Sequence, residues 1–265
     1  MNRRTALITG ASAGIGEAFA EVFAANGFDV VLTARREDRL HAVATRLRDR
    51  FGVTAHVIPA DLSHPAAPAM LWRAVEERGL TIDALVNNAG YGIPGAFIAS
   101  EWPRQQALLQ VMVVALAELT HRALPGMIAR RYGRIINVAS LAALVPAPAG
   151  HTLYAATKGF VVKFSEALAA EVRDSGVHVT AICPGFTRSE FHDVTGTRAK
   201  VDQLPPWMWL DAATVAREGL AAVSAATPVS VVGRVNRVIA WLARIIPRRL
   251  LVALGRRTAH RYRRS

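Results

Sequence analysis

The sequence predicts an α/β fold in which one doubly wound, parallel sheet carries helices on both faces. Short apolar runs alternate along the chain with longer amphipathic segments, which is the element order of a chain that winds from strand to helix to strand. The runs are continuously apolar, as is typical of strands that are buried on both faces. Residues 1–230 contain no Ser/Gly-rich linker and no internal repeat, so we expect a single domain there and a basic helical tail over 231–265.

The individual elements follow from the same pattern. We expect strands at 5–9, 30–34, 53–59, 82–87, 134–139 and 177–183, with a short last strand at 229–232. We expect helices at 14–26, 37–51, 65–78, 102–131 and 152–175. The segment 186–210 is predicted to be irregular, and Asp211 is placed to cap the helix that follows it.

The net charge of +12 is unevenly placed along the chain. Residues 231–265 hold ten arginines and no acidic residue, which leaves 22 basic against 20 acidic residues in the remainder. The single cysteine, Cys183, excludes an intramolecular disulfide and a thiolate zinc cluster, so we expect no metal, and a reducing, cytoplasmic compartment is compatible. No apolar run is long and uninterrupted enough to predict a signal peptide or a membrane-spanning helix.

The first strand leads directly into a glycine-rich turn, Thr9-Gly10-Ala11-Ser12-Ala13-Gly14-Ile15-Gly16, that opens a helix. Glycines let the backbone turn tightly and approach a pyrophosphate, and the helix N-terminus supplies amide donors. We expect a dinucleotide to bind here, against Gly10, Ser12, Gly14, Ile15 and Gly16. The alternative is an ordinary strand-to-helix turn, which the position between a first strand and a helix disfavours.

The end of the second strand predicts which dinucleotide binds. An acidic residue there accepts the ribose 2′-hydroxyl of NAD, whereas a cation accommodates the 2′-phosphate of NADP. The strand ends in Arg35 and Arg36, with no acid before Glu37, so NADP(H) is favoured over NAD(H). We expect Arg35 to be the main phosphate partner because a guanidinium binds phosphate in a bidentate way. The alternative, that both arginines only begin a solvated helix, conflicts with the helix dipole, which disfavours cations there.

A second group of residues suggests proton transfer. Tyr154 and Lys158 are four residues apart on a predicted helix and share one face, and Ser140 ends the preceding strand. A cation near a phenol favours the phenolate form, so Tyr154 could exchange a proton with a carbonyl or alcohol oxygen that Ser140 holds. Taken alone, such a pair is more often surface helix packing; the glycine turn makes the catalytic interpretation the better one.

With these residues in place, the chain resembles the classical short-chain dehydrogenases/reductases over nearly all of residues 5–230. The resemblance is carried by the glycine turn, by Ser140 with the Tyr154/Lys158 pair, and by three shorter motifs in the family's order: Asp61-Leu62, Asn87-Asn88-Ala89-Gly90 and Pro184-Gly185. It implies a Rossmann-type domain and an NAD(P)-dependent oxidoreductase that transfers a hydride between nicotinamide and a carbonyl carbon. We also expect a homo-oligomer.

The resemblance assigns roles to single residues. Tyr154 would be the general acid/base, Lys158 would lower its pKa and bind the nicotinamide ribose, and Ser140 would orient the substrate oxygen. The remaining cofactor contacts would come from Asp61 and Leu62 at the adenine, from Asn88, Ala89 and Gly90 along the cofactor, and from Pro184, Gly185, Thr187 and Ser189 at the nicotinamide end.

One position departs from the family. An asparagine that usually lies in the long helix after the fourth strand is replaced by Met112. This puts the proton relay in doubt, although a methionine that fills a buried helix face is equally compatible with its neighbours. The alternative function is therefore a non-catalytic NADP-binding or membrane-associated scaffold protein that keeps the fold.

The segment after Pro184-Gly185 suggests the substrate class. In the family this region covers the substrate, and here it contains Phe186, Trp207 and Trp209. Together with Leu141 they predict an apolar pocket and a hydrophobic ketone, aldehyde or secondary alcohol. Alternatively, the two tryptophans pack the lid or a subunit contact.

The tail suggests a location. Arg234, Arg237, Arg244 and Arg248 fall within roughly 80° of one another on a helix, and apolar residues that include Trp241 occupy the rest. This pattern fits a helix lying on an anionic membrane surface, which would make a cytoplasmic enzyme peripheral on the membrane. Docking on the substrate cleft or on a neighbouring subunit is the alternative. Nucleic-acid binding is not expected, because the basic stretch has one tyrosine for stacking and no known reading motif.

Overall fold

The computed structural model describes residues 3–147, 149–247 and 249. Seven strands form one sheet in the order β3-β2-β1-β4-β5-β6-β9, and every neighbouring pair is parallel. The strands are β1 (Thr5–Thr9), β2 (Asp29–Thr33), β3 (Ala55–Val57), β4 (Ile82–Asn87), β5 (Gly133–Val138), β6 (Val177–Cys183) and β9 (Val229–Val231). The predicted doubly wound parallel fold is confirmed, and the predicted strand at 53–59 is shortened to three residues.

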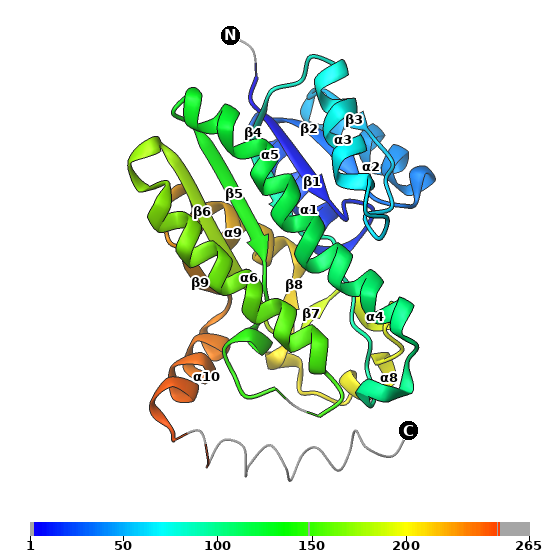
Figure 1. Ribbon diagram of the computed structural model, residues 1–265, viewed down its shortest axis with the longest axis vertical. Helices are drawn as coiled ribbons and strands as arrows, with labels where there is room; N and C mark the ends of the chain where they lie inside the picture. The colour runs from blue at the N-terminus through cyan, green and yellow to red at the C-terminus, as the bar shows by residue number, and fades with distance from the viewer. Residues whose placement is uncertain (1–2, 148, 248, 250–265) are drawn as a thin grey trace.

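Helices cover both faces of this sheet (Figure 1). One face carries α1 (Gly14–Ala25), α2 (Glu37–Phe51) and α9 (Ala212–Ser224). The other carries α3 (Ala67–Glu77), α4 (Trp102–Leu109), α5 (Ala115–Ala129) and α6 (Thr152–Glu171). The central strands are continuously apolar because they serve both layers: Ala6 and Ile8 of β1 belong to the first core, whereas Leu7 belongs to the second.

The helix predicted over 102–131 is present as Trp102–Ala129, but it is not α-helical throughout. A π-helical turn at Gln110–Val114 separates α4 from α5. By length and apolar composition the combined segment Trp102–Ala129 could cross a membrane. However, Leu108, Met112 and Leu119 are fully buried in the second core, so we assign it as a core helix. A π turn inside a helix often marks a functional site, and this one lies beside the cavity described below.

The segment after β6, predicted to be irregular, folds into short elements. They are β7 (Thr187–Arg188), α7 (Phe191–Val194), α8 (Arg198–Val201) and β8 (Leu210–Asp211), and β7 pairs with β8. We call residues 186–210 the lid. Asp211 caps α9 as predicted, because its carboxylate accepts a hydrogen bond from the Thr214 amide at 2.7 Å.

The first part of the tail forms α10 (Arg234–Ile245), which packs on β9. Asn236 is buried there: its amide donates to the Val232 carbonyl at 2.8 Å, and its side chain lies directly against Gly185. The predictions for Arg248 and for 250–265 lie outside the described residues, and the division of the chain at residue 230 stays a prediction.

Candidate active site

A cavity of about 800 Å³ opens at the carboxyl ends of the sheet strands, where ligands bind in open parallel sheets. It brings together nearly all the residues that the sequence predicted. Its lining includes Gly10, Ser12, Gly14, Ile15, Arg35, Arg36, Asp61, Leu62, Asn88, Ala89, Gly90, Ser140, Leu141, Tyr154, Lys158, Pro184, Gly185, Phe186, Thr187 and Ser189. Among the predicted site residues, Gly16, Trp207 and Trp209 lie outside this lining.

Hydrogen bonds fix the glycine turn to the end of β4. The Thr9 hydroxyl accepts hydrogen bonds from the Asn88 and Ala89 amides at 2.9 and 3.0 Å and donates to the Val86 carbonyl at 3.2 Å. The Asn88 side chain in turn donates to the Thr9 carbonyl at 2.9 Å. Thr9 was not among the predicted site residues. Its position at the start of the turn was the available signal, because the turn needs an anchor to the neighbouring strand.

The turn leaves no room for side chains where a cofactor would lie. Gly10 and Gly14 have φ values of +66° and +59°, a region that L-residues rarely adopt. A Cβ on Gly16 would lie 2.2 Å from the Gly10 carbonyl oxygen. Gly16 therefore allows the start of α1 to pack closely against the backbone of the turn. This bare, amide-rich turn at the start of α1 fits a dinucleotide pyrophosphate.

The two arginines after β2 point in different directions. Arg35 lies near Asp61 and Tyr91, since its positive charge helps to lower the pKa of Asp61 and opposes the rise that burial causes in the pKa of Tyr91. Arg36 instead donates to the Ser12 hydroxyl at 3.2 Å. The structure therefore joins Arg36 to the glycine turn, whereas the sequence favoured Arg35 as the phosphate partner.

The proposed catalytic residues meet at the inner end of the cavity. Ser140 lies two residues after β5 and accepts a hydrogen bond from the Ala142 amide at 3.1 Å, and it is also hydrogen-bonded to Tyr154 on the first turn of α6. Lys158 lies one turn further, only 7% exposed, with its Nζ 5.8 Å from the centre of the Tyr154 ring. The Lys158 ammonium donates to the Val138 carbonyl at 2.6 Å.

Burial controls the protonation of this site. It raises the pKa of Tyr154, an effect that the hydrogen bond from Ser140 partly offsets. It also lowers the pKa of Lys158 to about 8. The resemblance implied that Lys158 depresses the Tyr154 pKa. In the structure, removal of the phenol from water is the larger effect, and the ammonium is bonded to the Val138 carbonyl.

A buried polar network supports the site from below. The Asn87 amide donates to the Thr120 hydroxyl at 3.0 Å and to the Asn137 side-chain oxygen at 2.9 Å. Asn137 then donates to the Ser165 hydroxyl at 2.9 Å. The network joins β4, β5, α5 and α6, so it fixes the two strand ends that carry Asn88 and Ser140.

Met112 lies on the π turn and contacts the site from the core side. It is 2% exposed, its side chain lies against Gly90, and its sulfur is 4.0 Å from the Thr157 hydroxyl. The structure therefore supports the core-filling interpretation of Met112, and no polar side chain stands at this position.

The outer part of the cavity is apolar, but not through the tryptophans. Trp207 lies in a turn after Pro205 and Pro206 that directs it outward, and it is 64% exposed. Trp209 packs on Phe186, with ring centroids 6.0 Å apart, outside the lining. The apolar wall instead comprises Leu141, Val145, Phe186, Phe191 and Val201. Phe191, which the sequence analysis did not assign to the pocket, contacts the Tyr154 ring at 5.7 Å.

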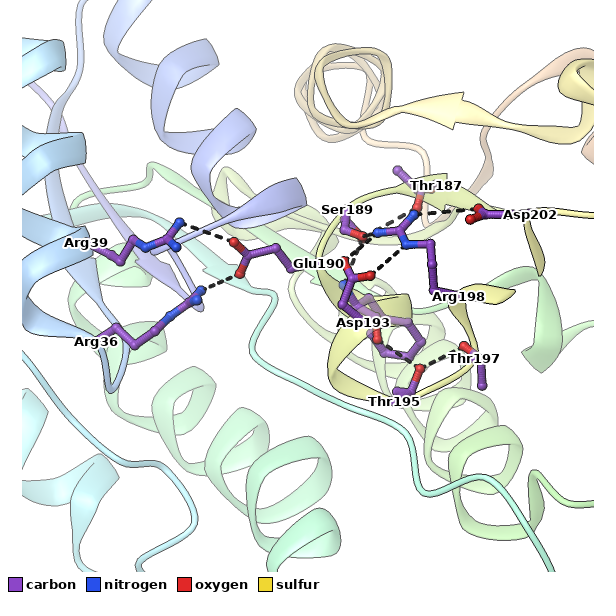
Figure 2. Close-up of polar contacts among 11 residues, drawn as sticks. Arg36, Arg39, Thr187, Ser189, Glu190, Asp193, Thr195, Thr197, Arg198 and Asp202 are labelled. Carbon is purple, nitrogen blue, oxygen red and sulfur yellow. Dashed lines mark hydrogen bonds and ion pairs between the residues drawn. The ribbon is translucent and has the colours of Figure 1, made fainter. Parts of the chain in front are cut away.

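Polar contacts hold the lid together and tie it to the cofactor end of the cavity (Figure 2). Arg198 bonds both oxygens of Asp193 at 2.6 and 2.7 Å and the Ser189 carbonyl at 2.7 Å. Separately, Glu190 forms ion pairs with Arg36 and Arg39. Nothing in the sequence signalled Glu190, because its partners lie about 150 residues away. In the part of the chain that the structure describes, no three His, Cys, Asp or Glu side chains are grouped as metal ligands.

Comparison with known proteins identifies the family. The family model described as short chain dehydrogenase matches residues 4–199. The 7beta-hydroxysteroid dehydrogenase of Collinsella aerofaciens is 34% identical over 181 residues, which cover 68% of each chain.

Two solved structures are also similar. The short-chain dehydrogenase from Sphingobium yanoikuyae in complex with NADPH is 35% identical, with a TM-score of 0.79 and coverage of 86% of this chain and 87% of that one. The bulky-bulky ketone specific alcohol dehydrogenase from Comamonas testosteroni is 32% identical, with a TM-score of 0.75 and coverage of 87% and 86%.

Proposed function

The chain belongs to the short-chain dehydrogenase family and is an NAD(P)-dependent oxidoreductase; we propose that it uses NADP(H) to interconvert hydrophobic ketones or aldehydes and their alcohols. The observation that carries this proposal is the position of Ser140, Tyr154 and Lys158 in one cavity with the glycine turn. A small-molecule substrate then lies between the apolar wall and the Tyr154 hydroxyl.

The residues of the site divide the chemistry as follows. The bound nicotinamide supplies or accepts the hydride. In reduction, Tyr154 donates its phenol proton to the substrate oxygen, and a pKa raised by burial keeps that proton in place until transfer. Ser140 bonds the same oxygen and fixes its position. In oxidation, the positive charge of Lys158, protonated below about pH 8, stabilises the phenolate that must accept the proton.

Two features support NADP(H) over NAD(H). Arg35 and Arg36 line the cavity at the end of β2, and Arg36 is already joined to Ser12 of the glycine turn. This pair of guanidinium groups suits a ribose 2′-phosphate. The similar Sphingobium structure is a complex with NADPH.

Support for a hydrophobic substrate comes from the cavity wall and from the relatives. Phe186, Phe191 and Leu141 line the cavity with apolar surface, and the Phe191 ring contacts that of Tyr154. The Comamonas enzyme is specific for bulky-bulky ketones, and the Collinsella enzyme is a hydroxysteroid dehydrogenase. We therefore place ketones with two large apolar substituents first among candidate substrates.

The proposal is tested with purified protein, NADPH and a series of ketones from small to bulky, with NADPH consumption as the readout. We expect turnover that rises with the apolar bulk of the ketone. The same series is run with Met112→Asn, which restores the polar residue that the family usually has. Cofactor binding without turnover in the wild type, together with turnover in Met112→Asn, would favour the non-catalytic alternative. The relatives do not favour that alternative, since they are described as dehydrogenases.

We further propose that the enzyme is cytoplasmic and lies peripherally on an anionic membrane surface through α10. This helix contacts the body through Asn236 and Ala240, and it turns the side chains of Val238, Trp241 and Ile245 outward. Trp241 is 59% exposed. An apolar stripe with a tryptophan beside arginines suits the boundary between lipid headgroups and acyl chains. The three arginines of α10, Arg234, Arg237 and Arg244, also disfavour the pairing of this surface with a second copy of itself. Homo-oligomerisation elsewhere on the molecule stays a prediction.

The membrane proposal is tested by flotation with vesicles of anionic or zwitterionic lipid. We expect the wild type to float with anionic vesicles and Trp241→Glu to lose most of this binding, because the variant places a carboxylate in the apolar stripe. Trp102→Glu is the matched control, since Trp102 is also 59% exposed but lies on α4. Equal flotation of the wild type and both variants would contradict the role of α10.

A further inference from the structure

Glu190 is the one lid residue whose side chain reaches across to α2 within the described contacts. Its carboxylate oxygens lie 2.8 Å from Arg36 Nη2 and 3.2 Å from Arg39 Nη1. Figure 2 shows the two arginines converging on Glu190 from the side opposite the lid, apart from the cluster around Arg198. The bridge therefore joins the lid to the cofactor end of the cavity and not to the substrate end.

The bridge lies next to the glycine turn. Ser189, the residue before Glu190, packs so closely on the turn that a Cβ on Gly14 would be 2.9 Å from the Ser189 Cβ. The same Arg36 nitrogen that contacts Glu190 also donates to the Ser12 hydroxyl at 3.2 Å. Ser12, Arg36 and Glu190 all line the cavity. The Glu190 carboxylate thus stands at the position where an anion bound by Arg36 and Ser12 would be held.

A carboxylate and a phosphate bind a guanidinium group in the same way. Each accepts two parallel N–H bonds, and two anions that share one guanidinium repel each other. NADP presents such a phosphate, whereas NAD presents a neutral hydroxyl at the same ribose position. The Glu190 carboxylate must therefore leave Arg36 when NADP binds but not when NAD binds.

We propose that Glu190 is a specificity-determining residue that competes with the cofactor 2′-phosphate for Arg36. This inference rests on the proposed preference for NADP(H). Arg39 gives the carboxylate a second partner after it leaves Arg36, so the lid keeps an attachment to α2. The bonds from Arg198 to Asp193 and to the Ser189 carbonyl are separate from the bridge and continue to hold the lid. The consequence is weaker NADP(H) binding than the two arginines alone would give, and easier release of the spent cofactor.

The experiment measures equilibrium dissociation constants of NADPH and NADH by the change in nicotinamide fluorescence, at low and high salt. We expect Glu190→Gln to tighten NADPH binding by roughly fivefold, the size of one exposed charge interaction, and to leave NADH nearly unchanged. The gain should shrink at high salt because both charged groups are partly exposed. The thermal midpoint of the variant is measured in parallel to verify that it folds like the wild type.

Two further variants separate competition from general electrostatics. Glu37→Gln removes a carboxylate beside Arg36 that pairs with His41 instead, and we expect a clearly smaller gain in NADPH affinity. In an Arg36→Ala background, Glu190→Gln should bring no gain, because the group for which the two anions compete is absent.

The outcomes distinguish this inference from the proposed function. If wild type binds NADH as tightly as NADPH and Arg36→Ala weakens both equally, the NADP(H) preference itself is wrong. If Arg36→Ala weakens NADPH selectively but Glu190→Gln leaves NADPH affinity unchanged, only the competition is overturned. If Glu190→Gln weakens both cofactors, Glu190 is a strap that holds the lid closed, and the proposal is likewise overturned.

Discussion

Replacement of Tyr154 by phenylalanine is expected to reduce turnover by about 10²–10⁴-fold, the range typical for loss of a positioned general acid or base. The hydroxyl is the group that Ser140 contacts, and Tyr154 is a half-buried residue of the cavity lining. Phenylalanine keeps the ring contact with Phe191 at 5.7 Å, so the lid and the cofactor site should be preserved. Steady-state NADPH consumption and NADPH binding, measured on the same preparation, give the two readouts.

Tyr91 provides a matched control for this variant. It is a second tyrosine in the cavity lining, and burial raises its pKa as well. In the structure, however, the tyrosine hydrogen-bonded to Ser140 is Tyr154. Tyr91→Phe is therefore expected to keep most of its turnover. Comparable losses in both variants, or substantial turnover in Tyr154→Phe, would contradict the assignment of Tyr154 as general acid/base.

The parts of the candidate site that could be predicted from the sequence are those fixed by local chain geometry. The glycine turn follows β1 directly, and its positive φ values at Gly10 and Gly14 can be adopted without strain only by glycine. The strand ends were predictable because β1, β4, β5 and β6 are apolar runs buried on both faces, and β1 and β4 end at the polar residues Thr9 and Asn87. Parallel strands end at one edge of the sheet, so residues far apart in sequence were expected to meet there.

The parts that the sequence did not predict depend on contacts between distant segments. Glu190 reaches Arg36 and Arg39 only because the lid folds back over the glycine turn. Trp207 was assigned to the pocket for its apolar character, but a turn after two prolines directs it outward. The π turn at Gln110–Val114 has no periodicity that distinguishes it from the helix on either side. The charge of Glu190 and the apolar character of Trp207 could be read from the sequence. The direction in which each side chain points in the fold could not.

The protonation of Lys158 illustrates the same limit. Spacing alone places Lys158 on the face of Tyr154, and the resemblance implied that it lowers the Tyr154 pKa. Burial instead raises the pKa of Tyr154 and lowers the pKa of Lys158 itself to about 8. A buried ammonium with one close carbonyl partner, Val138 at 2.6 Å, is costly to the fold.

Lys158→Met is expected to lose turnover and yet to unfold less readily than the wild type in the absence of cofactor. In the folded protein the pKa of Lys158 is about 8, against 10.5 in the unfolded chain. Below about pH 8 both states are protonated, and the folded state carries the full penalty of a buried cation, on the order of 3 kcal/mol. Loss of the hydrogen bond to the Val138 carbonyl offsets about 1 kcal/mol of the gain from removing that cation. We therefore expect the variant to be more stable than the wild type by about 2 kcal/mol at neutral pH.

The pH dependence distinguishes this cause from a general packing effect. Between about pH 8 and 10.5 the unfolded chain binds more protons at Lys158 than the folded protein does. The contribution of Lys158 to the wild-type free energy of unfolding therefore rises with pH over this range. Methionine does not titrate, and the stability gap between variant and wild type should narrow over that window. Burial also raises the pKa of the Cys183 thiol to about 12, which opposes this gain above about pH 9 in both proteins. Urea unfolding is therefore compared between about pH 7 and pH 9. If the difference in free energy of unfolding between the variant and the wild type stays constant with pH, packing and not the buried charge of Lys158 sets that difference. If the difference narrows as pH rises and turnover is lost, the enzyme gives up stability to keep a cation beside Tyr154.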